Sequence, residues 1–272
     1  MTGVQTCALP ICTLLVGGTL RTDTHSLQGN IRICVNPDGS DGYTSISEMC
    51  DAVLLFEMPS VTVAERSGSP DPRDIDPPVD GTYSGNITSF GNGRVVKAGV
   101  GSLTLTGVNT YTGGTYILRG EVIGDTAAIQ GDVHICPDVA PLTTADNQSL
   151  DSLACDNSPS QLTFDISTDS AFAGTLFGQG KVEKIGDGKP SFTSTQATFE
   201  GILEISQGEL AINSNLGDPS LIDVVVTVNS DGTLSGTGTL EGNVTVETGG
   251  TIKGSLDLKA GLALSGTLDL TS

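Results

Sequence analysis

The chain has 272 residues, of which 36 are glycine and only 4% are aromatic, and its 32 acidic residues outnumber its 12 basic ones. The formal net charge of −20 argues against nucleic-acid binding and against docking to anionic lipid, because both need clustered Lys and Arg. No apolar run approaches the roughly 18 residues that a membrane-spanning helix needs, so we expect no membrane insertion of this segment.

Residues 1–12 are predicted not to belong to the native protein. The stretch from Thr2 to Ile11 matches, without a gap, the translation of a sequencing-library adapter in one reading frame. We therefore leave Met1 to Cys12 out of the fold prediction, as is done for processing scars. Cys7 and Cys12 are removed with this segment, and four cysteines remain.

The rest of the chain contains a duplication. Leu14–Cys34 aligns without gaps to Tyr116–Cys136, and each copy continues through a polar loop to a second cysteine followed by Asp. Phe90–Gly99 is repeated in the same way as Phe177–Gly186, and a weaker third copy begins at Gly208. We therefore divide residues 13–272 into repeats at 13–115, 116–207 and 208–272.

Within each copy the apolar residues alternate with period two, which is typical of β-strands. Leu103–Thr106, Val244–Val246 and Leu268–Leu270 are examples, and Gly-Gly, Asn-Gly or Asp-Gly steps separate such runs. Short strands with glycine corners, repeated at large offset with tolerated insertions, favour a solenoid over a sandwich, since each coil contacts only its neighbours. The sequence therefore predicts an all-β parallel β-helix with coils of roughly 20–25 residues.

Gly93–Val122 resembles the autotransporter-associated β-strand repeat, of the passenger-associated-transport-repeat type. The family pattern runs Lys-x-Gly-x-Gly, Leu-Thr-Leu-x-Gly, Asn-Thr-Tyr-Thr-Gly-Gly-Thr and Gly-x-Leu. Its residues here are Lys97, Gly99, Gly101, Leu103–Leu105, Gly107, Asn109–Thr115, Gly120 and, in place of Leu, Val122. Gly178–Leu210 is similar to a degraded second copy, which keeps Lys184 and Gly186 but has lost the Asn-Thr-Tyr-Thr-Gly-Gly core.

This resemblance implies a right-handed parallel β-helix that is a single-stranded fragment of a longer rod. It implies a structural or adhesive passenger, secreted or held at the bacterial cell surface and exported through a downstream outer-membrane β-barrel translocator that this chain does not contain. A host-surface or glycan ligand would fit this function. The family repeat carries no catalytic residues, so we expect no enzymatic activity, no catalytic residues, no metal and no cofactor.

The four remaining cysteines are expected to form two local disulfides. Cys34 and Cys50 bracket one polar loop, and Cys136 and Cys155 bracket the duplicated loop, so the duplication selects the pairs 34–50 and 136–155. Such staples fit an exported protein in an oxidising compartment. Free thiols and a four-cysteine zinc site are the alternatives, although the spacing lacks the short Cys-x-x-Cys pairs of zinc sites.

Three other patterns carry weaker functional alternatives. Asn36–Glu48 faintly resembles a calcium loop, but Pro37 and Gly39 cannot supply the first ligands. Ser67–Pro70 has the look of a serine-protease nucleophile, with only His25 and His134 available as bases. The acidic, proline-rich Glu65–Asp80 fits a surface excursion or a recognition loop. The alternative function is a polysaccharide-active β-helix enzyme or the stalk of a larger exported protease.

Overall fold

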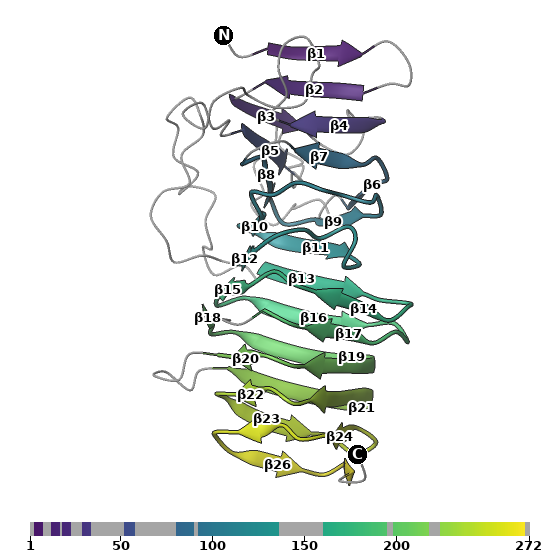
Figure 1. The fold of residues 1–272 in the computed structure, drawn as a ribbon, viewed down its shortest axis with the longest axis vertical. Helices are drawn as coiled ribbons and strands as arrows, with labels where there is room; N and C mark the ends of the chain where they lie inside the picture. Colours follow the sequence, from purple (N-terminus) through teal and green to yellow (C-terminus); the bar gives the residue numbers. More distant parts are fainter. Residues whose placement is uncertain are drawn as a thin grey trace, which may run out of the picture.

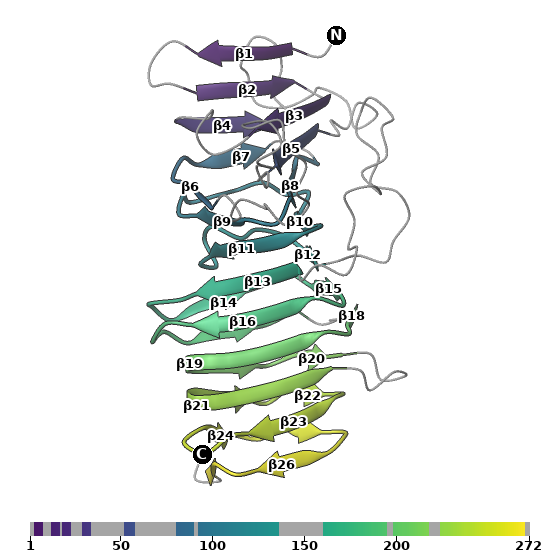
Figure 2. The same ribbon diagram turned by 180° about the vertical axis from the view of Figure 1, so that it is seen from behind.

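The structure is a computed structural model that describes residues 3–7, 12–16, 18–22, 29–33, 52–57, 80–89, 92–135, 160–194, 198–217 and 224–269. Regular structure within these residues is entirely β-strand. The strands stack along one long axis into a rod, with β1 (Gly3–Cys7) at one end and β26 (Leu262–Leu264) at the other (Figure 1). The reverse view shows the same continuous stack (Figure 2).

Each coil contributes strands to three faces of the rod, defined here by chain order and pairing. Face 1 consists of β2 (Cys12–Val16), β4 (Asn30–Ile33), β7 (Ile87–Ser89), β14 (Ser170–Phe172), β17 (Pro190–Phe192), the second halves of β19 (Ile202–Ile212) and β21 (Val225–Gly236), β24 (Thr251–Lys253) and β27 (Thr267–Asp269). Face 2 consists of β3 (Gly18–Thr22), β5 (Ala52–Glu57), β8 (Arg94–Ala98), β10 (Thr115–Ile117), β12 (Val133–Ile135), β15 (Leu176–Gly178), β18 (Thr198–Phe199), β20 (Asn215–Leu216), β22 (Thr239–Leu240) and β25 (Asp257–Leu258). Face 3 consists of β6 (Gly81–Tyr83), β9 (Ser102–Leu105), β11 (Gly120–Gly124), β13 (Ser160–Asp165), β16 (Lys181–Ile185), the first halves of β19 and β21, β23 (Asn243–Val246) and β26.

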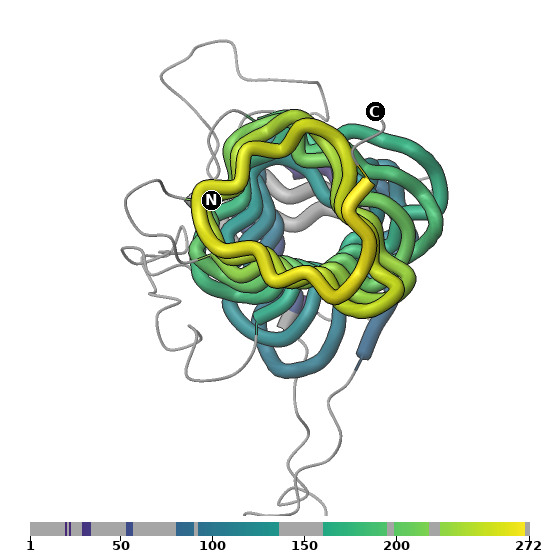
Figure 3. Tube along the Cα trace, turned by 90° about the horizontal axis from the view of Figure 1, so that it is seen from below, coloured from purple at the N-terminus to yellow at the C-terminus, as the bar shows by residue number. Residues whose placement is uncertain are grey.

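The parallel β-solenoid predicted from the sequence is confirmed. Viewed along the rod, successive coils lie over one another around a common axis (Figure 3). Residues paired on neighbouring coils of face 3 are 18 residues apart for Val244 and Leu262, and 23 apart for Leu203 and Val226. The spacing of 23 falls within the range of roughly 20–25 residues that the sequence predicted, whereas the coil of 18 residues is shorter than predicted.

The one antiparallel pair among the described strands is the hairpin of β1 and β2, in which Cys7 faces Cys12. β1 lies wholly within residues 1–12, the segment that the sequence predicts to be adapter-derived. The next pair, β2 with β4, is already parallel. Among the described strands, parallel stacking therefore begins with β2.

Rows of inward-pointing aliphatic side chains run the length of the rod and form its core. On face 3 one row contains Leu103, Val122, Leu162, Val182, Leu203, Val226 and Val244, all fully buried. Burying one such side chain stabilises the fold by about 1.5–3 kcal/mol. Because successive side chains of a strand point to opposite sides of the sheet, the period-two pattern of the sequence places every second residue in these rows.

The duplicated blocks lie on neighbouring faces of the rod and not on the same face. Gly18–Thr22 is β3 on face 2, whereas the aligned Gly120–Gly124 is β11 on face 3. Likewise Arg94–Ala98 is β8 on face 2, whereas Lys181–Ile185 is β16 on face 3. The duplicated unit therefore spans three coils plus one face, which three similar faces can accommodate.

Local packing is nevertheless the same in both copies. Gly85 lies against the carbonyl oxygen of Gly29 beside the ring of Tyr83, and Gly174 lies against that of Gly131 beside the ring of Phe172. A Cβ added at Gly174 would lie 2.0 Å from the Gly131 carbonyl oxygen. These glycines let the chain turn between faces while neighbouring coils remain in contact.

We predict that Gly174→Ala destabilises the rod by about 2–3 kcal/mol or more, because the added methyl overlaps a backbone carbonyl that cannot move without separating two coils. Gly261→Ala is the matched control, since its Cβ would meet only the Asn243 Oδ1, at 3.0 Å. Guanidinium unfolding followed by circular dichroism measures both variants. Equal stability of the two variants would contradict the packing described here.

Candidate functional site

A buried lysine joins two coils inside the repeat that the sequence singled out. Lys97 on β8 points into the core and is 0% exposed. Its Nζ donates hydrogen bonds to the carbonyl oxygens of Ala98 at 3.1 Å, Gly99 at 2.7 Å and Arg119 at 3.1 Å. Arg119 belongs to the following coil, so one ammonium group satisfies the carbonyls of two stacked corners.

The charge of this ammonium is set by two opposing effects. Burial lowers the pKa of Lys97 to about 7, and the nearby carboxylates of Asp80 and Glu121 oppose that decrease. Three carbonyl acceptors match the three N–H donors of an ammonium, so the hydrogen bonds also favour the protonated form. The group acts as a structural hydrogen-bond donor to backbone carbonyls where no strand partner is present.

The second copy has an equivalent corner, which lies on face 3 instead of face 2. Lys184 on β16 is 1% exposed, and its Nζ donates to the carbonyl oxygens of Gly186 and, at 2.9 Å, Gln207 of the next coil. Gly208 has a φ of +70°, and a Cβ there would lie 2.6 Å from the Lys184 Nζ. Glycine is therefore required both by the backbone conformation and by the approach of the ammonium.

In the middle of the repeat, between β9 and β10, the described chain forms no named strand on face 1, and side-chain hydrogen bonds connect the neighbouring coils instead. Asn109 is buried; its Oδ1 accepts from the backbone N–H of Ile87 at 2.8 Å and its Nδ2 donates to the carbonyl of Ala128 at 2.7 Å. The Tyr111 hydroxyl lies 2.7 Å from the Thr115 hydroxyl. These contacts connect the coils before and after the interruption, so the repeat motif is a structural device.

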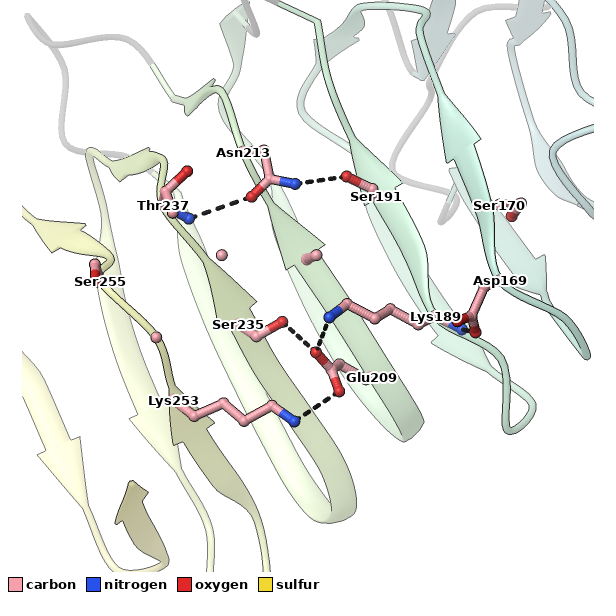
Figure 4. A pocket seen from close by; sticks show the side chains of 13 residues that line it. Asp169, Ser170, Lys189, Ser191, Glu209, Asn213, Ser235, Thr237, Lys253 and Ser255 are labelled. Atoms are coloured by element: carbon pink, nitrogen blue, oxygen red, sulfur yellow. Dashed lines mark hydrogen bonds and ion pairs between the residues drawn. The ribbon is translucent and has the colours of Figure 1, made fainter. Parts of the chain in front are cut away.

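A polar groove with a volume of about 590 Å³ lies on face 1 (Figure 4). It crosses β14, β17, β19, β21 and β24, and hence several successive coils. One side carries a row of charged residues, and the other carries Ser191, Asn213 and Thr237. Apart from glycine, the only apolar residue in the lining is Ala211, which is 2% exposed.

Glu209 is the centre of the charged row. Its carboxylate lies 2.6 Å from the Lys189 ammonium and 2.8 Å from the Lys253 ammonium, and it accepts a hydrogen bond of 2.5 Å from Ser235. Burial alone would raise the pKa of Glu209, but the hydrogen bonds from both lysines and Ser235 lower it to about 2. The carboxylate is therefore ionised at any pH near neutrality and holds both lysines along the groove (Figure 4).

The opposite side of the groove is held by uncharged groups. The Asn213 Nδ2 donates to the Ser191 hydroxyl at 2.7 Å, and the backbone N–H of Thr237 donates to the Asn213 Oδ1 at 3.3 Å. Three successive coils thus present amide and hydroxyl groups in one line along the rod. Both donors and acceptors face the groove from two sides.

A stack of three rings lies on the outside of face 2. Tyr116, His134 and Phe177 occupy the same register position on β10, β12 and β15. Their ring centroids are 4.4 Å and 4.6 Å apart, with interplanar angles of 4° and 7°. Burial lowers the pKa of His134, with Asp132 opposing and Arg94 reinforcing that decrease. The rings cover one another's inner faces and the Arg94 guanidinium lies 5.7 Å from the centroid of the Tyr116 ring, so the stack stabilises the contact between successive coils.

The structure describes only some of the site residues that were predicted from the sequence. Cys34, Cys50, Cys136 and Cys155 lie outside the described residues, as do Asn36–Glu48, Ser67–Pro70 and His25. His134 occupies a strand position, as predicted, between two aromatic rings. Among the described residues no three His, Cys, Asp or Glu side chains are grouped to hold a metal ion, and none of these residues forms a helix long and apolar enough to cross a membrane.

Sequence reasoning did not find the groove or the ring stack. The signal for both is recurrence of outward positions at the coil spacing, as in Asp169, Lys189 and Glu209, or in Tyr116 and His134. This recurrence becomes visible only when the coils are placed in register, because insertions make their lengths unequal. The duplication at large offset does not reveal it, since aligned copies lie on different faces.

We predict that Lys97→Met costs about 2–4 kcal/mol of stability, because three buried carbonyl oxygens lose their donor while the apolar stem is kept. Lys259→Met is the control: Lys259 is 47% exposed in its side chain and pairs only with Asp257 among the ion pairs of the described residues. Thermal and guanidinium unfolding should separate the two variants clearly. If both unfold like the wild type, Lys97 does not act as a clamp between coils.

We also predict that Glu209 contributes stability that is present above pH about 4.5 and is lost as the pH falls towards about 2, because its folded pKa lies below its ordinary value of 4.5. Glu209→Gln should reduce this pH dependence by about 1 kcal/mol, after allowance for solvent screening. Stability measured between pH 2 and pH 7 tests this, with Glu247→Gln as a control for the change in net charge. An unchanged pH dependence in Glu209→Gln would rule out the described ion pairs.

Comparison with known proteins places the repeat motif in a family. A family model described as the passenger-associated-transport-repeat matches residues 95–123, the segment that contains Lys97, Asn109 and Tyr111. Over 147 residues the chain is 31% identical to the adhesin BmaC autotransporter of Brucella suis biovar 1 (strain 1330). The match covers 51% of this chain and 4% of that relative, so the chain spans a small part of the relative's length. No solved structure matched the chain.

The matched residues are those with structural roles in the rod. Lys97, Gly99 and Gly120 build the corner at which two coils are joined, and Asn109 bridges the interruption of face 1. Motif, stacked parallel coils and similarity to an autotransporter adhesin agree with one another. The chain thus carries a passenger-associated-transport repeat and is similar over about half of its length to an autotransporter adhesin.

Proposed function

We propose that this chain is a rigid, surface-exposed segment of a secreted bacterial passenger, and that the passenger acts in adhesion. The observation that carries the proposal is a passenger-associated-transport repeat built into a stack of parallel coils. A rod of this kind has a closed apolar core and long polar faces, so it can hold binding surfaces far from the cell. The name of the relative, an adhesin autotransporter, supports the same function.

The partner implied by this proposal is a linked outer-membrane translocator domain, through which the passenger reaches the cell surface. The net charge of −20 keeps such an exposed rod soluble and disfavours association between copies. Two local disulfides, Cys34 with Cys50 and Cys136 with Cys155, fit this oxidising location. Both pairs bracket insertions between strands, so they would close loops without disturbing the stacked coils.

A polysaccharide-cleaving enzyme is less well supported by the groove. Glycoside hydrolysis needs a carboxylic acid whose pKa is raised so that it can donate a proton near neutral pH. The carboxylates that line the groove are Asp169 and Glu209, and ion pairs with two lysines hold the pKa of Glu209 at about 2. We therefore infer that Glu209 does not act as the proton donor of a glycoside hydrolase.

The full chain should be displayed on a bacterial surface through a heterologous translocator, and adhesion of the cells to host-cell monolayers should be measured. We expect adhesion above that of cells carrying the translocator alone. We also expect adhesion to be lost in the double variant Lys97→Met and Lys184→Met, because the rod no longer holds its coils together. Surface exposure is verified by protease accessibility.

Two results would contradict the proposed function. One is a folded, accessible chain that confers no adhesion to any cell surface tested. The other is turnover of polygalacturonate or casein by the soluble chain, because this would make it an enzyme.

A further inference from the structure

We propose that the groove on face 1 binds an extended, uncharged oligosaccharide chain that runs along the rod axis across successive coils. This inference rests on the proposed adhesive function and names the class of ligand. The groove crosses five strands of stacked coils and has a volume of about 590 Å³, within the range of small-ligand sites. Neighbouring strands are about 4.8 Å apart, a spacing comparable with the length of one sugar unit in a chain.

The charged side of the groove supplies donors and acceptors in fixed positions. Each lysine ammonium has three N–H donors, and the ion pairs of Lys189 and Lys253 with Glu209 use one donor each. Glu209 keeps both side chains along the groove, which lowers the entropy lost when they hydrogen-bond to a ligand. Hydroxyl groups of a sugar can both accept from these ammoniums and donate to the carboxylate oxygens.

The uncharged side of the groove also offers hydrogen-bond donors and acceptors. The Asn213 side chain is exposed and held between the Ser191 hydroxyl and the backbone of Thr237. An amide has two N–H donors and a carbonyl oxygen with two lone pairs, so capacity remains on both atoms. A ligand in the groove would therefore meet hydrogen-bonding groups from both sides, as a hydroxyl-rich chain requires.

Other ligand classes fit this groove less well. An apolar helix would find no exposed apolar side chain in the lining, where Ala211 is 2% exposed. An added β-strand would need an open sheet edge, but β19 is hydrogen-bonded to β17 on one side and to β21 on the other. A polyanion would meet Asp169, Glu209 and the chain's net charge of −20.

The test is direct binding of cellohexaose, maltohexaose and chitohexaose to the full chain, with oligogalacturonate as the anionic comparison, by NMR titration or calorimetry. We expect at least one uncharged hexasaccharide to bind and Asn213→Ala to weaken that binding by about tenfold. Asn229→Ala is the matched control, because Asn229 also donates its Nδ2 to a serine hydroxyl, that of Ser206, but at the corner between face 3 and face 1 and outside the groove lining. Circular dichroism should show that both variants keep the wild-type fold.

The outcomes separate this proposal from the adhesive function. Binding that is equal in Asn213→Ala and Asn229→Ala, or no binding of any uncharged hexasaccharide, would overturn the groove as a glycan site. Binding of oligogalacturonate alone, lost in Lys189→Met, would overturn the assignment of an uncharged ligand. Displayed cells that adhere normally with Asn213→Ala would leave the adhesive function intact and reject the groove as its site.

Discussion

Registered stacking of one coil on the next is the constraint on which the rest of this structure depends. On face 3 each strand from β9 to β23 is hydrogen-bonded to the equivalent strand of the coil before and of the coil after, so a side chain that points inward on one coil meets an inward side chain on the next. Only apolar groups satisfy that position repeatedly, and Leu203, Val226 and Val244 show the result. Length changes must then fall between strands, and the longest stretch of chain between β11 and β16 separates the end of β12 at Ile135 from the start of β13 at Ser160.

The buried lysines are an exception that follows from the same constraint. The chain leaves its strand hydrogen-bonding pattern at each turn between faces, and the carbonyl groups there need another donor. Lys97 and Lys184 occupy inward positions and extend their ammonium groups to carbonyls of two successive corners. In both copies the lysine is paired, in the register of the sheet, with a phenylalanine of the preceding coil: Phe56 with Lys97, and Phe164 with Lys184.

Function on such a rod has to reside on its outer faces, since the interior is filled. Face 1 between β14 and β24 carries polar side chains at equivalent positions on successive coils. Ion pairs with Glu209 hold Lys189 and Lys253 in place. A site made of repeated, weak hydrogen-bonding positions suits an adhesin, because many such contacts along an exposed rod combine into strong attachment. The groove and the repeat motif thus occupy separate places on the rod: the motif builds the coil, and recognition by the groove is the role that we propose.

The sequence by itself determined the strand character, the solenoid class and the repeat motif, because alternation of apolar residues and the motif from Lys97 to Gly120 are local properties. It did not show that the duplicated blocks lie on successive faces, or that Ser191, Asn213 and Thr237 form one line. Those facts depend on how many residues each coil takes between corners, and that number varies with every insertion. Only the stacked coils decide which distant residues share a face, because hydrogen-bond register between coils, and not spacing along the chain, sets their position.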